Sequence, residues 1–212
     1  MTDFADMLNG YRRFRQTGWQ QQRERWDELR DGQSPKVMII ACSDSRVDPT
    51  QIFDTNPGET FVVRNVAALV PPYEQTPGHH GVSAALEFAV QVLGVSEILV
   101  MGHGLCGGCN AALTQELKDA PRGAGGFVAD WIRMLDEPRA RVLAHYGHDH
   151  SRDAQRAMEN EAVRLSLTNL RTFPWIAEKE AAGTLRLIGA RFAISDGVLH
   201  ILDEASGEFA PA

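Results

Sequence analysis

Three side chains of the types that bind zinc follow two apolar segments of the chain. Cys42 closes the run KVMIIAC, and His103 directly follows the run EILVMG. Cys106 lies three residues after His103. If both runs are parallel strands, their carboxyl ends meet at one edge of a sheet, where ligands bind in open α/β folds. Two thiolates and one imidazole suit Zn²⁺ in tetrahedral geometry, and a set of three leaves one position for water, as in catalytic zinc sites.

A carboxylate and a guanidinium follow Cys42 within four residues, in the stretch CSDSRV. Taken alone, Asp44 and Arg46 would be a loop aspartate with a salt-bridged surface arginine, which contributes little. Beside a metal thiolate they have a chemical role. A carboxylate there can accept a hydrogen bond from metal-bound water, and the arginine fork can keep it ionised and oriented. We therefore predict that Asp44 and Arg46 are a catalytic pair.

Cys109 leaves two other interpretations open, because Cys106-Gly-Gly-Cys109 is a C-x-x-C motif. With Cys109 as a fourth ligand, the site would be closed and structural. As a thioredoxin-like redox pair, Cys106 and Cys109 would need no metal. Structural sites usually draw their cysteines from two local pairs, and Cys42 has no neighbouring cysteine. The open catalytic site is therefore favoured, with Cys109 as a small core residue.

Composition and charge exclude several other classes of protein. The 212 residues are 43% hydrophobic, and the formal net charge is −7, so no basic stripe is available to bind nucleic acid. The longest apolar runs are too short to span a membrane. The N-terminal stretch lacks the pattern of a signal peptide, and three cysteines cannot all pair, so we expect a cytoplasmic protein with reduced or metal-bound thiols.

The order of predicted elements indicates an α/β fold with a central, mostly parallel sheet flanked by helices. Residues 1–32 are predicted to form an N-terminal helical arm, and residues 33–212 a single catalytic domain. A C-terminal hairpin is expected to turn at Asp196-Gly197. Strands are expected at 36–42, 59–67, 97–102, 185–194 and 198–202, and helices at 3–15, 18–30, from Asp48, 81–94, from about Asn110, 127–145, 151–172 and 174–182.

The paired motifs CSDSRV and GHGLCGG, with FVVRNVAALVPPYE and GVSAALEFAV, closely resemble the β-class carbonic anhydrases, particularly the plant-type branch. The resemblance implies that Cys42, His103 and Cys106 hold one Zn²⁺ per chain, with Asp44 and Arg46 as the catalytic dyad. It implies reversible hydration of carbon dioxide to bicarbonate and a proton, by attack of zinc-bound hydroxide. Alternatives are hydrolysis of carbon disulfide or carbonyl sulfide at the same site, and a non-enzymatic zinc-stabilised scaffold.

The resemblance also implies a substrate pocket and a partner. By the family pattern, Gln33 hydrogen-bonds substrate and Gly104 offers its backbone N–H, while Phe61, Val66 and Phe88 form an apolar wall. From the residues alone, these three apolar side chains would be assigned to the core. In the family, the neighbouring subunit contributes part of each pocket and the N-terminal helices embrace the partner, which implies a homodimer or a dimer of dimers.

One branch of the family binds regulatory bicarbonate through a tryptophan, an arginine and a tyrosine, and this moves the dyad aspartate onto zinc. Here Arg64 stands at the arginine position, but Ile39 and Phe192 occupy the other two. We therefore predict that this chain lacks the bicarbonate switch and that Asp44 stays off the metal at neutral pH.

Overall fold

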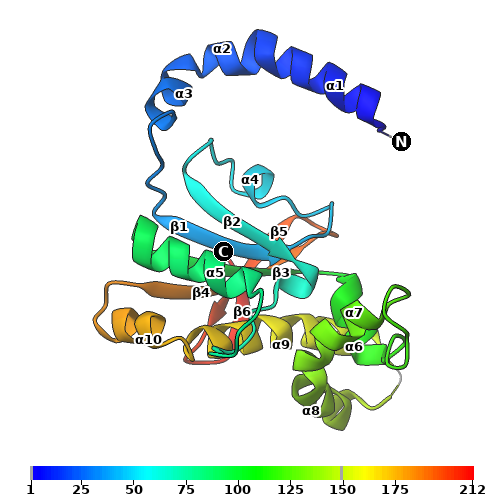
Figure 1. Ribbon diagram of the computed structural model, residues 1–212. Helices are drawn as coiled ribbons and strands as arrows, with labels where there is room; N and C mark the ends of the chain where they lie inside the picture. Colours follow the sequence, from blue (N-terminus) through cyan, green and yellow to red (C-terminus); the bar gives the residue numbers. More distant parts are fainter. Residues whose placement is uncertain (1, 149) are drawn as a thin grey trace.

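The computed structural model of the chain describes residues 2–148 and 150–212, which contain a six-stranded sheet (Figure 1). The strand order is β2-β1-β3-β4-β5-β6. Neighbours from β2 to β4 pair in parallel, whereas β5 and β6 are antiparallel. The predicted sheet and hairpin are confirmed, and β6 is an additional strand. The strands are Val37–Cys42 (β1), Thr60–Asn65 (β2), Glu97–His103 (β3), Arg186–Ala193 (β4), Val198–Asp203 (β5) and Glu208–Pro211 (β6).

The helices after β1 follow the predicted order, with two subdivisions. Asp48 caps the first of them by accepting from the N–H of Thr50, and Pro49 is its first residue, as predicted. The helix expected over residues 81–94 is divided into α5 and the π-helical η3, and the helix expected over residues 127–145 is divided into α7, η4 and α8. The bounds are Pro49–Ile52 (α4), Val66–Ala68 (η2), Gly81–Glu87 (α5), Phe88–Leu93 (η3), Gly107–Thr114 (α6), Gly126–Ile132 (α7), Arg133–Leu135 (η4), Asp136–Tyr146 (α8), Arg152–Leu170 (α9) and Pro174–Ala181 (α10).

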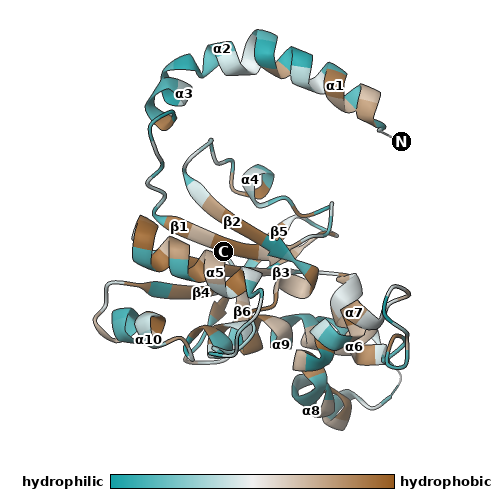
Figure 2. Cartoon of the chain, in the orientation of Figure 1, coloured by the Kyte–Doolittle hydropathy of each residue, from teal (hydrophilic) through white to brown (hydrophobic). Residues whose placement is uncertain are grey.

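The central strands are buried on both faces, which explains why they read as continuous apolar runs. Along β1, Met38 and Ile40 pack in one apolar cluster with α5, η3, α9 and α10. Ile39 and Ala41 point to the other face, where the partly buried Ile52 lies. Hydrophobic residues of the strands and of α5 are visible in Figure 2. A third cluster, which includes Cys42 and Cys106, lies beyond the carboxyl ends of the strands.

Helix α9 packs closely on β3 and β4 because two strand positions there carry no side chain. A methyl group at Gly102 would lie 2.8 Å from Val163 Cγ2, and one at Gly189 would lie 2.9 Å from Leu167 Cδ1. Such distances are shorter than any comfortable carbon–carbon contact. The two glycines therefore set the distance between α9 and the sheet.

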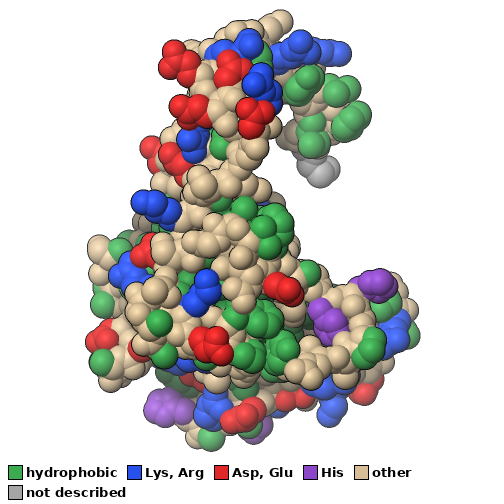
Figure 3. Space-filling model, turned by 60° about the vertical axis from the view of Figure 1, so that its left-hand side comes forward, with side chains coloured by type: hydrophobic (Ala, Val, Ile, Leu, Met, Phe, Trp, Pro, Cys, Tyr) green, Lys and Arg blue, Asp and Glu red, His purple; other side chains and the backbone are tan. Residues whose placement is uncertain are grey.

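The N-terminal arm differs in detail from the two predicted helices, 3–15 and 18–30. Helix α1 (Phe4–Arg13) continues through the π-helical segment η1 (Phe14–Gly18) into α2 (Trp19–Gln21), and α3 (Arg23–Leu29) follows a break at Gln22. Figure 1 shows this arm standing away from the sheet, and Figure 3 shows apolar side chains on its free end. The large exposed apolar side chains of the arm are Phe4, Met7, Leu8, Tyr11 and Phe14.

Among the described residues, no helix combines the length and apolar character needed to cross a lipid bilayer.

Candidate metal centre

Strand pairing brings the three predicted metal ligands together. Strands β1 and β3 are parallel neighbours, with Ala41 opposite Met101, so Cys42 and His103 end the two strands at the same edge. After Gly104 and Leu105 the chain reaches Cys106, the residue before α6. The ligating atoms of Cys42, His103 and Cys106 all lie within 4.8 Å of one another, and all three residues are buried.

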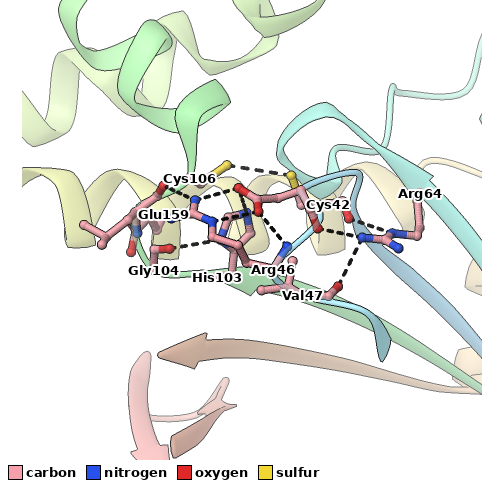
Figure 4. A network of polar contacts seen from close by, with 10 residues as sticks. Cys42, Arg46, Val47, Arg64, His103, Gly104, Cys106 and Glu159 are labelled. Atoms are coloured by element: carbon pink, nitrogen blue, oxygen red, sulfur yellow. Dashed lines mark hydrogen bonds and ion pairs between the residues drawn. The ribbon is translucent and has the colours of Figure 1, made fainter. Parts of the chain in front are cut away.

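The geometry of the three side chains fits a tetrahedral metal ion. The Sγ atoms of Cys42 and Cys106 are 4.0 Å apart (Figure 4). Two thiolates on one zinc at bond lengths of about 2.3 Å would be separated by about 3.8 Å. His103 Nδ1 lies 2.9 Å from the carbonyl oxygen of Gly104, which fixes the ring, while buried Nε2 has no hydrogen-bond partner among the described residues. A buried acceptor without a partner is costly, and a metal ion would satisfy it.

Cys109 lies outside this set. Within residues 2–148 and 150–212, the group formed by Cys42, His103 and Cys106 is the only one of its kind found. Cys109 is buried in the apolar cluster beyond the strands, as a small core residue would be. It still affects its neighbour, because a hydrogen bond with Cys109 raises the pKa of the Cys106 thiol, and burial adds to this. The hydrogen bond with Cys106, followed by burial, raises the pKa of Cys42 to about 12. A bound cation would have to displace both thiol protons.

The predicted dyad forms a two-pronged ion pair. Arg46 donates from Nε to Asp44 Oδ1 at 2.9 Å and from Nη2 to Oδ2 at 2.6 Å. The hydrogen bond from Arg46 is the largest influence on the Asp44 carboxyl, and it holds the pKa well below the usual range of an aspartate. Asp44 Oδ2 lies 3.9 Å from His103 Nε2, so an ionised carboxylate stands next to the metal-binding atoms.

A second arginine, Arg64 on β2, holds the loop that carries the dyad. Its guanidinium donates to the carbonyl oxygens of Cys42 (2.9 Å) and Asp44 (2.7 Å). It also forms an ion pair with Asp48, with Nη1 3.1 Å from Oδ2. Sequence reasoning placed Arg64 at a regulatory position and did not identify this role. With its donors engaged by loop carbonyls, Arg64 fixes the backbone from Cys42 to Asp44.

Glu159 on α9 supports residues 103–106, which carry the other two predicted ligands and are called the metal loop. Its Oε1 accepts from the N–H of Leu105 at 2.6 Å, and the carboxylate is 4% exposed. Burial raises the pKa of this carboxyl group. Leu105 has a left-handed backbone (φ 58°) and its carbonyl oxygen accepts from Arg46 Nη2 at 3.1 Å. Glu159 therefore connects α9, through Leu105, to the dyad.

The predicted pocket residues divide between the two ends of the sheet. Val66 lies beside the metal loop, since a methyl group at Gly108 would be 2.7 Å from its Cγ1. Phe61 and Phe88 stack with ring centroids 5.9 Å apart near the amino end of β1, where Phe61 pairs with Met38. Gln33 precedes β1 and lines a separate pocket there with Arg25, Glu28, Gly58 and Glu59. In a single chain, these three residues cannot touch a molecule bound near Cys42.

The expected role of Gly104 needs a correction. Its N–H donates to the carbonyl oxygen of Phe192 at 2.9 Å and is therefore engaged within the chain. The N–H of Leu105 is engaged by Glu159. Both amide groups position the metal loop, and neither is free to bind a substrate.

Comparisons with known proteins identify the family of the chain. The carbonic anhydrase family model matches residues 37–199. A carbonic anhydrase of Pseudomonas aeruginosa is 38% identical over 206 residues, which cover 96% of this chain and 90% of that protein. The structure of the β-carbonic anhydrase CcaA superposes with a TM-score of 0.89 at 31% identity, over 97% of this chain and 90% of the other. One of two tetrameric β-carbonic anhydrases from Sordaria macrospora superposes with a TM-score of 0.76 at 26% identity, over 94% of this chain and 96% of the other.

The match to the family model and the identity over nearly the whole chain establish the family. The buried cysteine–histidine–cysteine set lies at the ends of two adjacent parallel strands, within the segment that the family model matches. The chain belongs to the β-class carbonic anhydrases.

Proposed function

We propose that this chain hydrates carbon dioxide reversibly to bicarbonate and a proton, with one Zn²⁺ held by Cys42, His103 and Cys106. The observation that carries the proposal is the unpartnered Nε2 of His103, which faces two thiols beside an ionised Asp44. Three protein ligands are typical of a catalytic zinc site. When bound, zinc lowers the pKa of a coordinated water towards neutrality, an effect for which a carbonic anhydrase is itself the standard example.

The residues of the chain would orient the reactants around that water. Asp44 would accept a hydrogen bond from that water and so orient it towards the carbon of the substrate. Arg46 keeps Asp44 ionised and fixed, while its own bond to the carbonyl of Leu105 ties the dyad to the metal loop. Val66 contributes an apolar contact beside the site, which suits a substrate without a net dipole.

Stopped-flow hydration of carbon dioxide by the zinc-loaded enzyme tests the proposal. We expect kcat/KM to rise with pH through the pKa of the metal-bound water, because its deprotonated form is the nucleophile. The low pKa of Asp44 keeps that carboxylate ionised across this range. A flat profile from mildly acidic to alkaline pH would contradict the mechanism. Faster turnover of carbon disulfide or carbonyl sulfide would assign the site to those substrates, and no turnover of any of the three would favour a scaffold.

Asp44 is expected to stay off the metal at neutral pH, without a bicarbonate switch. Both of its oxygens are engaged by Arg46, and Arg64 is engaged by the carbonyls of the loop. Ile39 is 2% exposed and offers no polar group to an anion. A crystal structure at neutral pH with Asp44 as the fourth ligand would contradict this proposal.

We also propose that each pocket is completed by a second copy of the chain. Gln33, Phe61 and Phe88 lie at the end of the sheet opposite the metal, and Phe88 is 43% exposed. Within the described part of the chain, the apolar side chains of the arm are largely uncovered, with Phe4 71% and Met7 61% exposed. A contiguous exposed apolar surface of this kind marks an interaction site. The proposed assembly is a homodimer or a dimer of dimers, with residues 1–32 as the dimerisation arm.

Mixed oligomers test the shared pocket. We expect co-expressed Cys42→Ser and Gln33→Ala chains to be more active, per chain, than the mean of the two variants assayed separately. A mixed dimer contains one complete site, made from the metal ligands of the Gln33→Ala chain and the Gln33 of its partner. For random pairing in a symmetric dimer, about a quarter of the wild-type sites are restored. Activity equal to the mean would show that Gln33 acts within its own chain. The control is co-expression of Cys42→Ser with Cys106→Ser, because each of these chains lacks a metal ligand and no mixed dimer has a complete site.

A further inference from the structure

A pocket on the far side of the metal loop is lined by three arginines. It has a volume of about 330 Å³ and lies between the start of α9 and the end of β4. Arg152 and Arg156, one helical turn apart on α9, form its exposed rim, and Arg191 on β4 lies inside it. Glu159 is the one carboxylate among the described residues that line it. Three positive groups and one negative group give the lining a formal charge of +2, in a chain whose net charge is −7.

Arg191 is the residue that indicates a missing ligand. Its side chain is 10% exposed, and buried Nε has no hydrogen-bond partner among the described residues. The nearest carboxylate oxygen, Glu159 Oε2, is 3.8 Å from Nη1, which is beyond hydrogen-bonding distance. Burial lowers the pKa of Arg191, so its surroundings do not compensate its charge. A buried guanidinium with unused donors is costly unless an anion satisfies it.

The two rim arginines can turn towards the same ligand. Arg156 pairs with Asp153 and Arg152 with Gln155, but these contacts are on exposed side chains of α9, and such surface contacts contribute little and rearrange readily. Arg152 is also the first residue of α9, a helix of 19 residues, so the positive end of the helix dipole faces the same region. The pocket thus combines a buried guanidinium with two mobile ones.

We propose that this pocket binds a phosphate group, free or carried by a small metabolite. The arginine fork matches the paired oxygens of phosphate. A lining of +2 is neutralised by a phosphate dianion, whereas a carboxylate or bicarbonate monoanion leaves half of the charge. The bound group would lie against Gly104 and Leu105, behind the loop that carries His103 and Cys106. It would compete with Glu159 for Arg191, and Glu159 is the acceptor for the N–H of Leu105.

Calorimetric titration of the zinc-loaded enzyme with inorganic phosphate, at ionic strength held constant with chloride, tests the proposal. We expect saturable binding of one phosphate per chain. Arg191→Gln should weaken binding by about tenfold or more, since a charge-assisted hydrogen bond is lost. Arg191→Gln removes the positive charge nearest to the buried Glu159 and can impair folding. The double variant R152Q/R156Q, which changes exposed residues, therefore provides a second test with the same expected direction.

The control is Arg133→Gln, which removes one exposed arginine from η4, away from the pocket, and should not change the affinity. Equal affinity in the wild type and in both pocket variants would overturn the proposal, because phosphate would then be bound outside this pocket. Absence of saturable binding to the wild type, or equal affinity for acetate, would also overturn it. Glycerol phosphate distinguishes the sources: tighter binding than inorganic phosphate indicates a metabolite, and weaker binding indicates the free ion.

Discussion

Replacing Cys106 with serine is expected to abolish zinc retention and to lower kcat/KM for carbon dioxide hydration by at least about three orders of magnitude. A serine hydroxyl is not deprotonated at neutral pH and is a poor ligand for zinc, so the buried site loses one of its two thiolates. Without the metal, the pKa of the attacking water returns to that of bulk water, far above neutrality. Metal content per chain, measured by elemental analysis after dialysis, and stopped-flow rates check both parts.

The matched control is Cys109→Ala. Cys109 is 3% exposed in the apolar cluster, and alanine avoids placing an unsatisfied hydroxyl there. We expect this variant to keep one zinc per chain and most of its activity, with a loss of stability of about 1 kcal/mol for the missing sulfur. If Cys109→Ala lost the metal just as Cys106→Ser is expected to, the site would be a closed, four-ligand structural centre, and the proposed function would be wrong.

Asp44→Asn is expected to lower kcat/KM by about 10² to 10⁴ with zinc content unchanged. The amide keeps the shape of the side chain but loses the charge that orients the nucleophile, and it can no longer pair with both prongs of Arg46. Rates and metal content measured on the same preparation separate this effect from loss of the ion. An asparagine variant with wild-type kcat/KM would remove Asp44 from the mechanism.

The same ion pair predicts a dependence of stability on pH. Because Arg46 lowers the folded-state pKa of Asp44, the pair stabilises the fold above the unfolded-state pKa of about 3.9. This stabilisation is lost as pH falls below that value towards the folded-state pKa. Urea unfolding of the wild type and of Arg46→Gln should therefore differ at pH 7 and converge in acid. A difference that stays constant down to pH 3 would show that Arg46 acts through packing instead.

The metal ligands could be predicted from sequence because their positions depend on strand order. Two buried strands that alternate with helices are parallel, so the residues that end them, Cys42 and His103, come to one edge. Asp44 and Arg46 are two residues apart, and a local turn is enough to pair them. These contacts are either local or follow from the order of the strands, and the pattern of one sequence predicts both local turns and strand order.

The supporting contacts could not be predicted, because they depend on tertiary distances. Arg64 reaches the dyad loop across 20 residues of sequence, and Glu159 reaches Leu105 across 54. Glu159 did leave one signal, since it lies beside Met158 on the buried side of a helix where a carboxylate is unusual. The engaged N–H of Gly104 gave no such signal, because backbone hydrogen bonds between β3 and β4 depend on register. The break in the helix predicted over 127–145 did leave a signal in Pro138, which lies in the first turn of α8, because a proline is tolerated there but breaks a helix in its interior.

The close packing of α9 on the sheet has a consequence for the chemistry at a distance. Glu159 lies one turn before Val163 on the same helix, and Val163 rests directly on Gly102. A methyl group at position 102 would push this helix outward, and the carboxylate would withdraw from the Leu105 amide. Leu105 lies between two of the proposed metal ligands, His103 and Cys106, so their spacing would relax. The absence of a side chain at position 102 therefore influences the spacing of the proposed metal ligands. We expect a substitution there to lower turnover although it touches no reacting atom.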